Sequence, residues 1–104
     1  MSEKKIELKY ILDNNLHDSV LNSFYLDYNN KCVDLIVFTD FEKHLKIKIE
    51  GIKILNFDQR YDFKNREIIL DFDVDLNENK LNMFTTSENS CEILFKKITV
   101  LEIV

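Results

Sequence analysis

The stretch EIILDFDVDLNENK, residues 67–80, decides the fold. Apolar side chains recur at alternate positions, and three aspartates, Asp71, Asp73 and Asp75, lie between them. Successive side chains of a strand point to opposite faces, so this alternation predicts a strand with one buried and one solvated face. One face would carry Ile68, Leu70, Phe72, Val74 and Leu76, and the other would carry Ile69 with the three aspartates.

The same alternation recurs along the chain. It is clear in KKIELKYIL (4–12) and EKHLKIKIE (42–50). Less regular strand patterns occupy residues 23–28, 31–38, 80–85, 91–97 and 98–104. Several strands separated by short polar turns predict a mainly β fold, an antiparallel meander or a small sandwich.

Asparagine marks the expected turns, because the chain has one Gly and no Pro. Asn29-Asn30 predicts a two-residue hairpin turn. Residues 77–79 and 88–90 should bound the strand near 80–85. The segment around residues 15–24 fits a strand best, but Leu16, Val20 and Phe24 also have helical spacing. A short helix there, which would make the fold α+β, stays the alternative.

Length and composition predict a single domain over residues 1–104, because 104 residues with 45% hydrophobic content can bury one core. The N-terminus, MSEKKIELKY, has no apolar signal core, and no apolar run is long enough to span a membrane. A cytoplasmic, membrane-free protein is expected. In that compartment Cys32 and Cys91 should be reduced and buried.

The acidic charge is concentrated in one segment. Residues 58–92 hold nine acids and four bases, a balance of −5 that equals the net charge of the whole chain. Such a field repels nucleic acid and attracts basic partners. We therefore expect no nucleic-acid binding.

The aspartate stripe does not fit a calcium loop. An EF-hand that begins D-x-D-x-D needs Gly at position six and Glu at position twelve, where this chain has Leu76 and Asn82. Three similar carboxylates on one strand face also lack the asymmetry of an acid–base pair. Two interpretations remain open. The stripe is either a solvated face that pairs with Lys46 and Lys48, or a partner-binding surface.

No catalytic, metal or cofactor site is expected elsewhere. His17-Asp18-Ser19 are adjacent in sequence, whereas a triad needs three side chains that converge from separate places. The segment DQRYDF (58–63) looks like a loop, and its Arg60 and Tyr61 belong to residue types that dominate binding energy at protein interfaces. The chain is therefore expected to bind rather than to catalyse.

Three segments resemble small bacterial immunity proteins of polymorphic toxin and contact-dependent growth inhibition systems. LHDSVLNSFYLDYNNKCVDLIV (16–37) resembles their opening, and EGIKILNF (50–57) resembles their glycine-bearing strand, with Gly51 as the lone glycine. TSENSCEILFKKITVLEI (86–103) resembles their last hairpin. The resemblance implies a cytosolic, non-enzymatic protein without cofactor that binds the C-terminal domain of a cognate toxin, often a nuclease.

A toxin-binding surface can be suggested from the acidic segment. Its anions would be Asp58, Asp62, Asp71, Asp73 and Asp75, with Arg60 and Tyr61 as anchors. The alternative is a small β adaptor or self-associating module that uses residues 98–104 as an edge strand. Whether the chain is a monomer or a dimer is left open by the sequence.

Overall fold

β-strands account for most of the chain in the computed structural model, which describes residues 3–7, 16–39, 43–58 and 67–103. The strands are β1 (Glu3–Ile6), β2 (Val20–Asp27), β3 (Cys32–Phe38), β4 (His44–Glu50), β5 (Ile54–Asp58), β6 (Glu67–Asp75), β7 (Lys80–Thr85), β8 (Ser90–Leu94) and β9 (Lys97–Ile103). No helix occurs in these described ranges. The mainly β prediction is confirmed, and the helical alternative for residues 16–24 is wrong.

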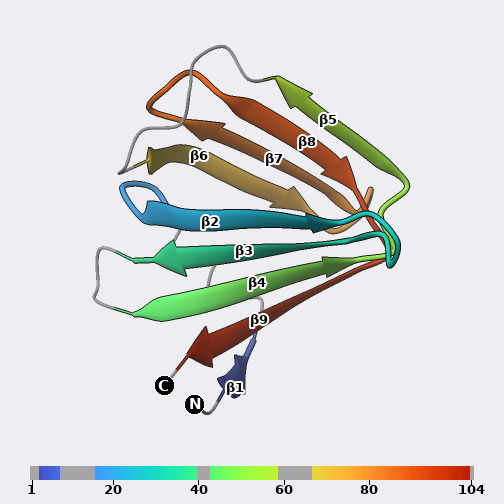
Figure 1. Ribbon diagram of the computed structural model, residues 1–104, viewed down its shortest axis with the longest axis horizontal. Helices are drawn as coiled ribbons and strands as arrows, with labels where there is room; N and C mark the ends of the chain where they lie inside the picture. Colours follow the sequence, from blue (N-terminus) through green and yellow to red (C-terminus); the bar gives the residue numbers. More distant parts are fainter. Residues whose placement is uncertain (1–2, 8–15, 40–42, 59–66, 104) are drawn as a thin grey trace.

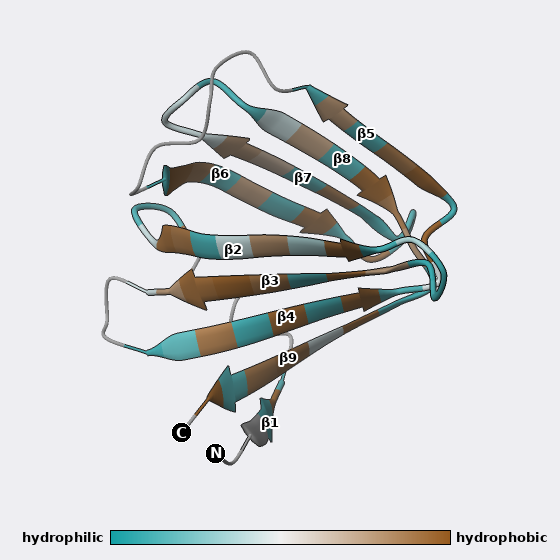
Figure 2. Cartoon of the chain, in the orientation of Figure 1, coloured by the Kyte–Doolittle hydropathy of each residue, from teal (hydrophilic) through white to brown (hydrophobic). Residues whose placement is uncertain are grey.

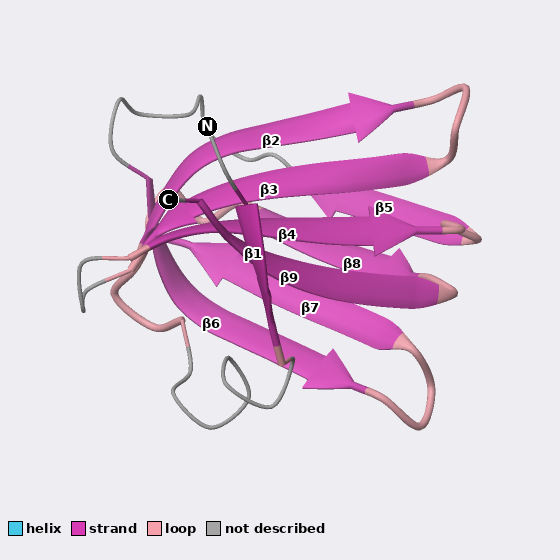
Figure 3. Cartoon of the chain, turned by 90° about the horizontal axis from the view of Figure 1, so that it is seen from below, coloured by secondary structure: helices cyan, strands magenta, loops and turns pink. Residues whose placement is uncertain are grey.

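The nine strands form one antiparallel sheet in the order β1-β9-β4-β3-β2-β6-β7-β8-β5 (Figure 1). Two local meanders, β2-β3-β4 and β6-β7-β8, supply half of the neighbouring pairs. The two meanders meet at β2 and β6, which pair at Val20↔Ile68 and Leu21↔Glu67. Beyond these pairs β2 and β6 diverge, and the sheet folds over so that its two halves face each other (Figure 3).

The core lies between the two halves. Along β4, brown apolar residues alternate with teal polar residues of the outer face (Figure 2). The fully buried apolar side chains are Leu16, Val33, Leu35, Val37, Leu45, Ile47, Ile49, Ile69, Leu81, Ile93 and Val100. Phe24 of β2 and Phe57 of β5 also meet across the fold, with ring centroids 5.5 Å apart. One hydrophobic cluster therefore joins strands that are distant in the sheet order.

A β-bulge changes the predicted faces of β6. The register with β7 shifts between Ile69 and Asp71. Ile69 is consequently buried together with Phe72 and Val74, whereas Leu70 is only half-buried. The predicted grouping of Leu70 with Phe72 and Val74, opposite Ile69, was wrong because one extra residue reverses the parity of alternation.

The β2–β3 turn is longer than predicted. Asp27 pairs with Cys32, which leaves four residues, Tyr28–Lys31, in the loop rather than the two predicted. The Asp27 carboxylate accepts hydrogen bonds from the backbone N–H of Asn30 at 3.2 Å and from its side-chain amide at 2.7 Å. The side-chain amide is the main cause that lowers the pKa of Asp27. Lys31 closes the loop with φ 53°.

Four chain connections meet at one end of the molecule, which we call the turn end: residues 28–31, 51–53, 76–79 and 95–96 (Figure 1). Backbone hydrogen bonds tie them to one another or to adjacent strand ends. These bonds run from Ile52 N to Lys31 O, from Lys53 N to Leu94 O, from Phe95 N to Asn79 O, and from Lys96 N to Glu50 O. The turn end is therefore a connected surface and not a set of separate loops.

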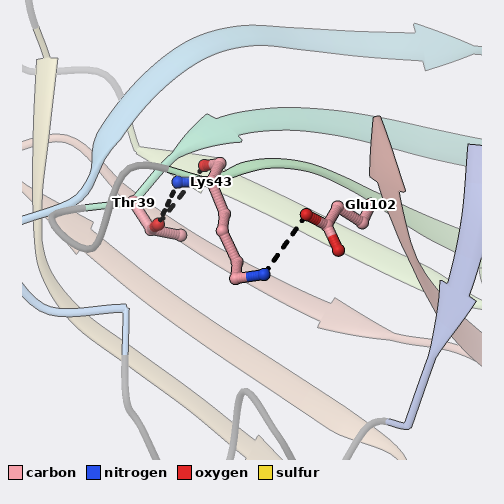
Figure 4. A network of polar contacts seen from close by, with 3 residues as sticks. All are labelled: Thr39, Lys43 and Glu102. Atoms are coloured by element: carbon pink, nitrogen blue, oxygen red, sulfur yellow. Dashed lines mark hydrogen bonds and ion pairs between the residues drawn. The ribbon is translucent and has the colours of Figure 1, made fainter. Parts of the chain in front are cut away.

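The C-terminal strand is internal. β9 lies between β1 and β4, so residues 98–103 are not an edge, and the edges of the strand order are β1 and β5. β9 also does not pair with β8, so the predicted last hairpin is wrong. Lys43 anchors the β4 side of this region, because its Nζ lies 3.3 Å from Glu102 Oε2 while its N–H donates to Thr39 Oγ1 (Figure 4).

Gly51 is required where it stands. Its φ is +66°, and a Cβ there would lie 2.8 Å from Lys96 Cβ. We expect Gly51→Ala to lower the free energy of unfolding by more than about 1 kcal/mol, because the backbone is left-handed and the contact involves the rigid base of a side chain. Gly51→Asn, which tolerates this φ better, serves as the control for the backbone contribution in urea denaturation. Equal stability of Gly51→Ala and the wild type would contradict this assignment.

Candidate partner-binding surface

The outer surface of β6, β7, β8 and β5 is acidic, and we call it the acidic face. Strand pairing arranges its side chains in rows that cross the strands. The first row is Asp71, Phe84, Ser90 and Asp58, the second is Asp73, Asn82, Glu92 and Asn56, and the third is Asp75, Lys80, Leu94 and Ile54. Side chains at the intervening positions, such as Phe72, Leu81 and Ile93, point into the core.

The charge of the acidic face is strongly one-sided. Among the described residues of the three rows, five carboxylates, those of Asp58, Asp71, Asp73, Asp75 and Glu92, stand against one ammonium group, that of Lys80, for a balance of −4. The Lys80 Nζ lies 3.5 Å from Glu92 Oε2, so this cation is already associated with an acid of the face. Both groups are partly exposed, so the pair contributes little to stability.

An exposed aromatic ring lies among these acids. Phe84 is 40% exposed although it belongs to a strand in the middle of this half of the sheet. It lines a shallow depression of about 590 Å³ together with Asp58, Asp71, Asn82 and Glu92. An apolar ring surrounded by carboxylates matches a partner that presents a cationic side chain with an apolar stem, such as arginine or lysine.

Four of the predicted toxin-binding residues come together on this face. Asp58 and Asp71 lie at the two ends of the first row, on β5 and β6. Three strand spacings separate them, which corresponds to about 14 Å. Asp73 follows in the second row and Asp75 in the third. Arg60, Tyr61 and Asp62 lie outside the described residues, so their predicted role as anchors and anion stays a prediction.

Asp75 has a structural role as well. Its Oδ1 accepts hydrogen bonds from the N–H groups of Asn77, at 2.9 Å, and Glu78, at 3.3 Å, in the four-residue loop before β7. Asn79 ends this loop with φ 52°. Asp75 therefore orders a turn in the same way as Asp27 does, and it is less available to a partner than Asp71 or Asp73.

We expect Asp75→Ala to lower the free energy of unfolding by about 1 kcal/mol, because two backbone N–H groups lose their acceptor. Asp75→Asn keeps an acceptor oxygen and removes the charge, so it should retain most of the stability. Chemical denaturation of both variants checks this. Equal losses in the two variants would mean that the charge of Asp75, and not its hydrogen bonds, stabilises the turn.

The predicted pairing of the aspartates with Lys46 and Lys48 does not occur. These lysines are on β4, which pairs with β3 and β9 and not with β6. Lys46 lies opposite Ile36 and Leu101, and Lys48 lies opposite Asp34 and Thr99. The prediction assumed that the strands carrying these opposite charges are neighbours. In the sheet order, β3 and β2 lie between β4 and β6.

The His17-Asp18-Ser19 segment does not form a catalytic triad. His17 Nδ1 lies 3.1 Å from Asp18 Oδ2, and both side chains are more than half exposed. Ser19 is fully buried, and its Oγ has no hydrogen-bond partner in the described structure. A buried hydroxyl without a base cannot act as a nucleophile.

The two cysteines show no sign of activation. Both are free thiols, and Cys91 is buried whereas Cys32 is half-buried. Burial raises the pKa of Cys91 to about 12, and desolvation is also the largest cause that raises the pKa of Cys32. Raised values leave little thiolate at neutral pH. Among the residues that the structure describes, no group of three or more His, Cys, Asp or Glu side chains is placed to hold a metal ion.

Sequence reasoning missed several members of the acidic face, among them three that line the depression. Phe84, Asn82 and Glu92 were not singled out, although Glu92 lies in the acidic segment 58–92. Alternation in KLNMFT pointed to a strand, but only the register with β6 and β8 shows that Phe84 faces the same way as Asp71. A local pattern cannot supply that register.

No protein-family model matches this chain, and no curated protein matches it in sequence. Within the described residues, no helix has the length and apolar character needed to cross a membrane.

Proposed function

We propose that this chain is an immunity protein that binds the C-terminal domain of a cognate bacterial toxin and neutralises it without catalysis. The acidic face is the binding surface, and the toxin domain is a nuclease or another protein with a basic active surface. The chain acts in the cytoplasm, where such a toxin would reach its target. The resemblance of residues 16–37 to immunity proteins suggested this class of function.

The observation that carries the proposal is the gathering of five carboxylates around the exposed Phe84 on one sheet face. A nuclease active site is commonly basic because it holds phosphates. An acidic protein surface can cover such a site, and its field raises the rate of encounter. A standard interface covers about 800 Å² of each partner. That area is about an eighth of the 6595 Å² surface of the described chain.

Phe84 would provide the apolar centre of the interface. Binding energy is usually concentrated in a few well-packed central residues, and charged residues at the rim mainly set rate and specificity. Asp71 lies directly opposite Phe84 on β6, and Ser90 lies opposite it on β8. A basic side chain of the toxin that packs on the Phe84 ring could thus contact a carboxylate without leaving the depression.

The experiment begins with the DNA immediately upstream of this reading frame. The C-terminal domain encoded there is expressed alone and together with this chain. The proposal expects that the domain kills cells alone, that co-expression restores growth, and that the two proteins co-purify. A neighbouring domain that is harmless, or whose toxicity this chain does not relieve, would count against the immunity function.

A further inference from the structure

A second surface, at the turn end, has the opposite character to the acidic face. Its four connections contain three lysines, Lys31, Lys53 and Lys96, and one acid, Glu78, a balance of +2 in a chain of net charge −5. The strand ends that flank these connections add three acids, Asp27, Glu50 and Asp75, and two lysines, Lys80 and Lys97, so the balance with the flanks is +1. The turn end is therefore weakly basic, in contrast to the acidic face.

A groove of about 320 Å³ opens between β2 and β5 at this end. Its lining comprises Leu26, Tyr28, Lys31, Ile52, Lys53 and Leu55. Tyr28 is 84% exposed and Leu26 is 37% exposed, so two large side chains on either side of Asp27 contact solvent. Neither Lys31 nor Lys53 forms an ion pair with another described residue. The groove thus combines an apolar floor with two available cations.

The backbone beside the groove is also available. Beyond Leu21, no described strand pairs with β2 on the side away from β3. β5 is likewise an edge of the strand order, and it pairs with β8 on one side. β2 and β5 approach each other through Phe24 and Phe57 without pairing in the described structure. An extended segment of a partner can add to a free strand edge of this kind.

We propose that the groove between β2 and β5 binds an extended acidic peptide segment of another protein. Apolar side chains of that segment pack between Leu26 and Leu55, its carboxylates pair with Lys31 and Lys53, and its backbone runs beside β2. Charge complementarity selects an acidic segment, because a basic one would be repelled here and attracted to the acidic face. This site is independent of the proposed toxin-binding surface and does not require the immunity function.

The test uses the full chain and a fluorescein-labelled peptide in which Glu alternates with Leu. Fluorescence anisotropy is expected to show saturable binding. It should weaken by about tenfold in Lys53→Glu, which places a carboxylate against those of the peptide. Lys31→Asn removes the second cation and suits the left-handed φ of 53° at this position, so it tests the charge with little risk to the fold.

Two control variants establish whether a loss of affinity is specific to the groove. Lys5→Glu makes the same charge change on exposed Lys5 of β1 and should leave the affinity unchanged. Glu7→Lys changes the charge in the other direction at an exposed acid that follows β1 and should not weaken binding either. A peptide in which Ser replaces Leu should lose most of its affinity. The proposal is overturned if the acidic peptide does not bind, if Lys53→Glu and Lys31→Asn bind it like the wild type, or if Lys5→Glu weakens it equally.

Discussion

Reversing the charge of Asp71 is expected to weaken binding of the toxin domain by about 100-fold, which corresponds to about 2.7 kcal/mol. Asp71 is exposed and lies directly opposite Phe84, so a lysine there would meet the cationic groups of the partner next to the apolar centre of the interface. Part of the loss should appear in the association rate, because the field of the acidic face is reduced by two charge units. The affinity and the association rate are measured by surface plasmon resonance.

The matched control for Asp71→Lys is Glu7→Lys. Glu7 is an exposed acid that follows β1, and its replacement changes the net charge by the same amount. It should leave affinity nearly unchanged, and it should slow association only slightly. Comparable losses in the two variants would show that net charge, and not the acidic face, governs binding. Unfolding curves of both variants establish that each retains the stability of the wild type.

Glu67→Ala is expected to lower the free energy of unfolding by about 3 kcal/mol. Glu67 opens β6 and is only 2% exposed. Its carboxylate accepts hydrogen bonds from the hydroxyl group of Thr85, from the N–H of Ser87 at 3.1 Å, and from the Oγ of Ser87 at 2.8 Å. Removing the carboxyl group leaves the N–H and the hydroxyl of Ser87 without this acceptor, and the Thr85 hydroxyl keeps only the Asn89 carbonyl at 3.5 Å.

Urea denaturation measures this effect, with Glu67→Gln as the control. Glutamine keeps the length and one acceptor oxygen but presents an amide to donors, so it should lose about half as much stability. The free energy of unfolding of a domain of this size is about 5–15 kcal/mol, so the alanine variant should still fold. A loss below about 1 kcal/mol in Glu67→Ala would contradict a structural role for the network.

The Glu67 network also connects stability to the acidic face. Thr85 ends β7 directly after Phe84. Ser87 lies in the β7–β8 connection, three residues before Ser90. The same connection is fixed by the hydrogen bond from Thr85 N to Asn89 O at 3.0 Å. The buried carboxylate thus holds the strands that present Phe84 to a partner.

The existence of the strands could be predicted from the sequence, because a two-residue alternation is a local property of the chain. β4 follows that pattern throughout, and β7 follows it as far as Met83. The bulge in β6 could not be predicted, since nothing in EIILDFDVD marks the position of an extra residue. The bulge leaves Asp71 and Asp73 exposed, as predicted, but places Ile69 in the core.

The order of the strands in the sheet could be predicted even less from the sequence. β9 pairs with β4 and β1, and β2 meets β6 across more than forty residues of chain. Such non-local pairings depend on how the whole sheet folds over the core, and a local pattern does not encode them. For that reason Asp58 and Asp71 could be grouped only by their charge, whereas Phe84 and Glu92 could not be placed beside them at all.

The burial of Glu67 could not be predicted from its neighbours in the sequence. A glutamate between an arginine and an isoleucine looks like a surface residue, since carboxylates are rarely buried unless they are paired or hydrogen-bonded. Its donors, Thr85 and Ser87, lie 18 and 20 residues away, in a segment that the sequence identified only as the end of a strand and a turn. The hydrogen-bonding partners become visible only once β6 and β7 are paired.

The most direct test of the proposed binding surface is a backbone amide NMR titration of the labelled chain with the purified toxin domain. The account predicts that the largest shift changes fall on Asp71, Asp73, Asn82, Phe84 and Glu92. Residues on the opposite outer surface, such as Asp34, Lys48 and Thr99, should change little. Shift changes concentrated on that opposite surface, with the acidic face unaffected, would contradict the account.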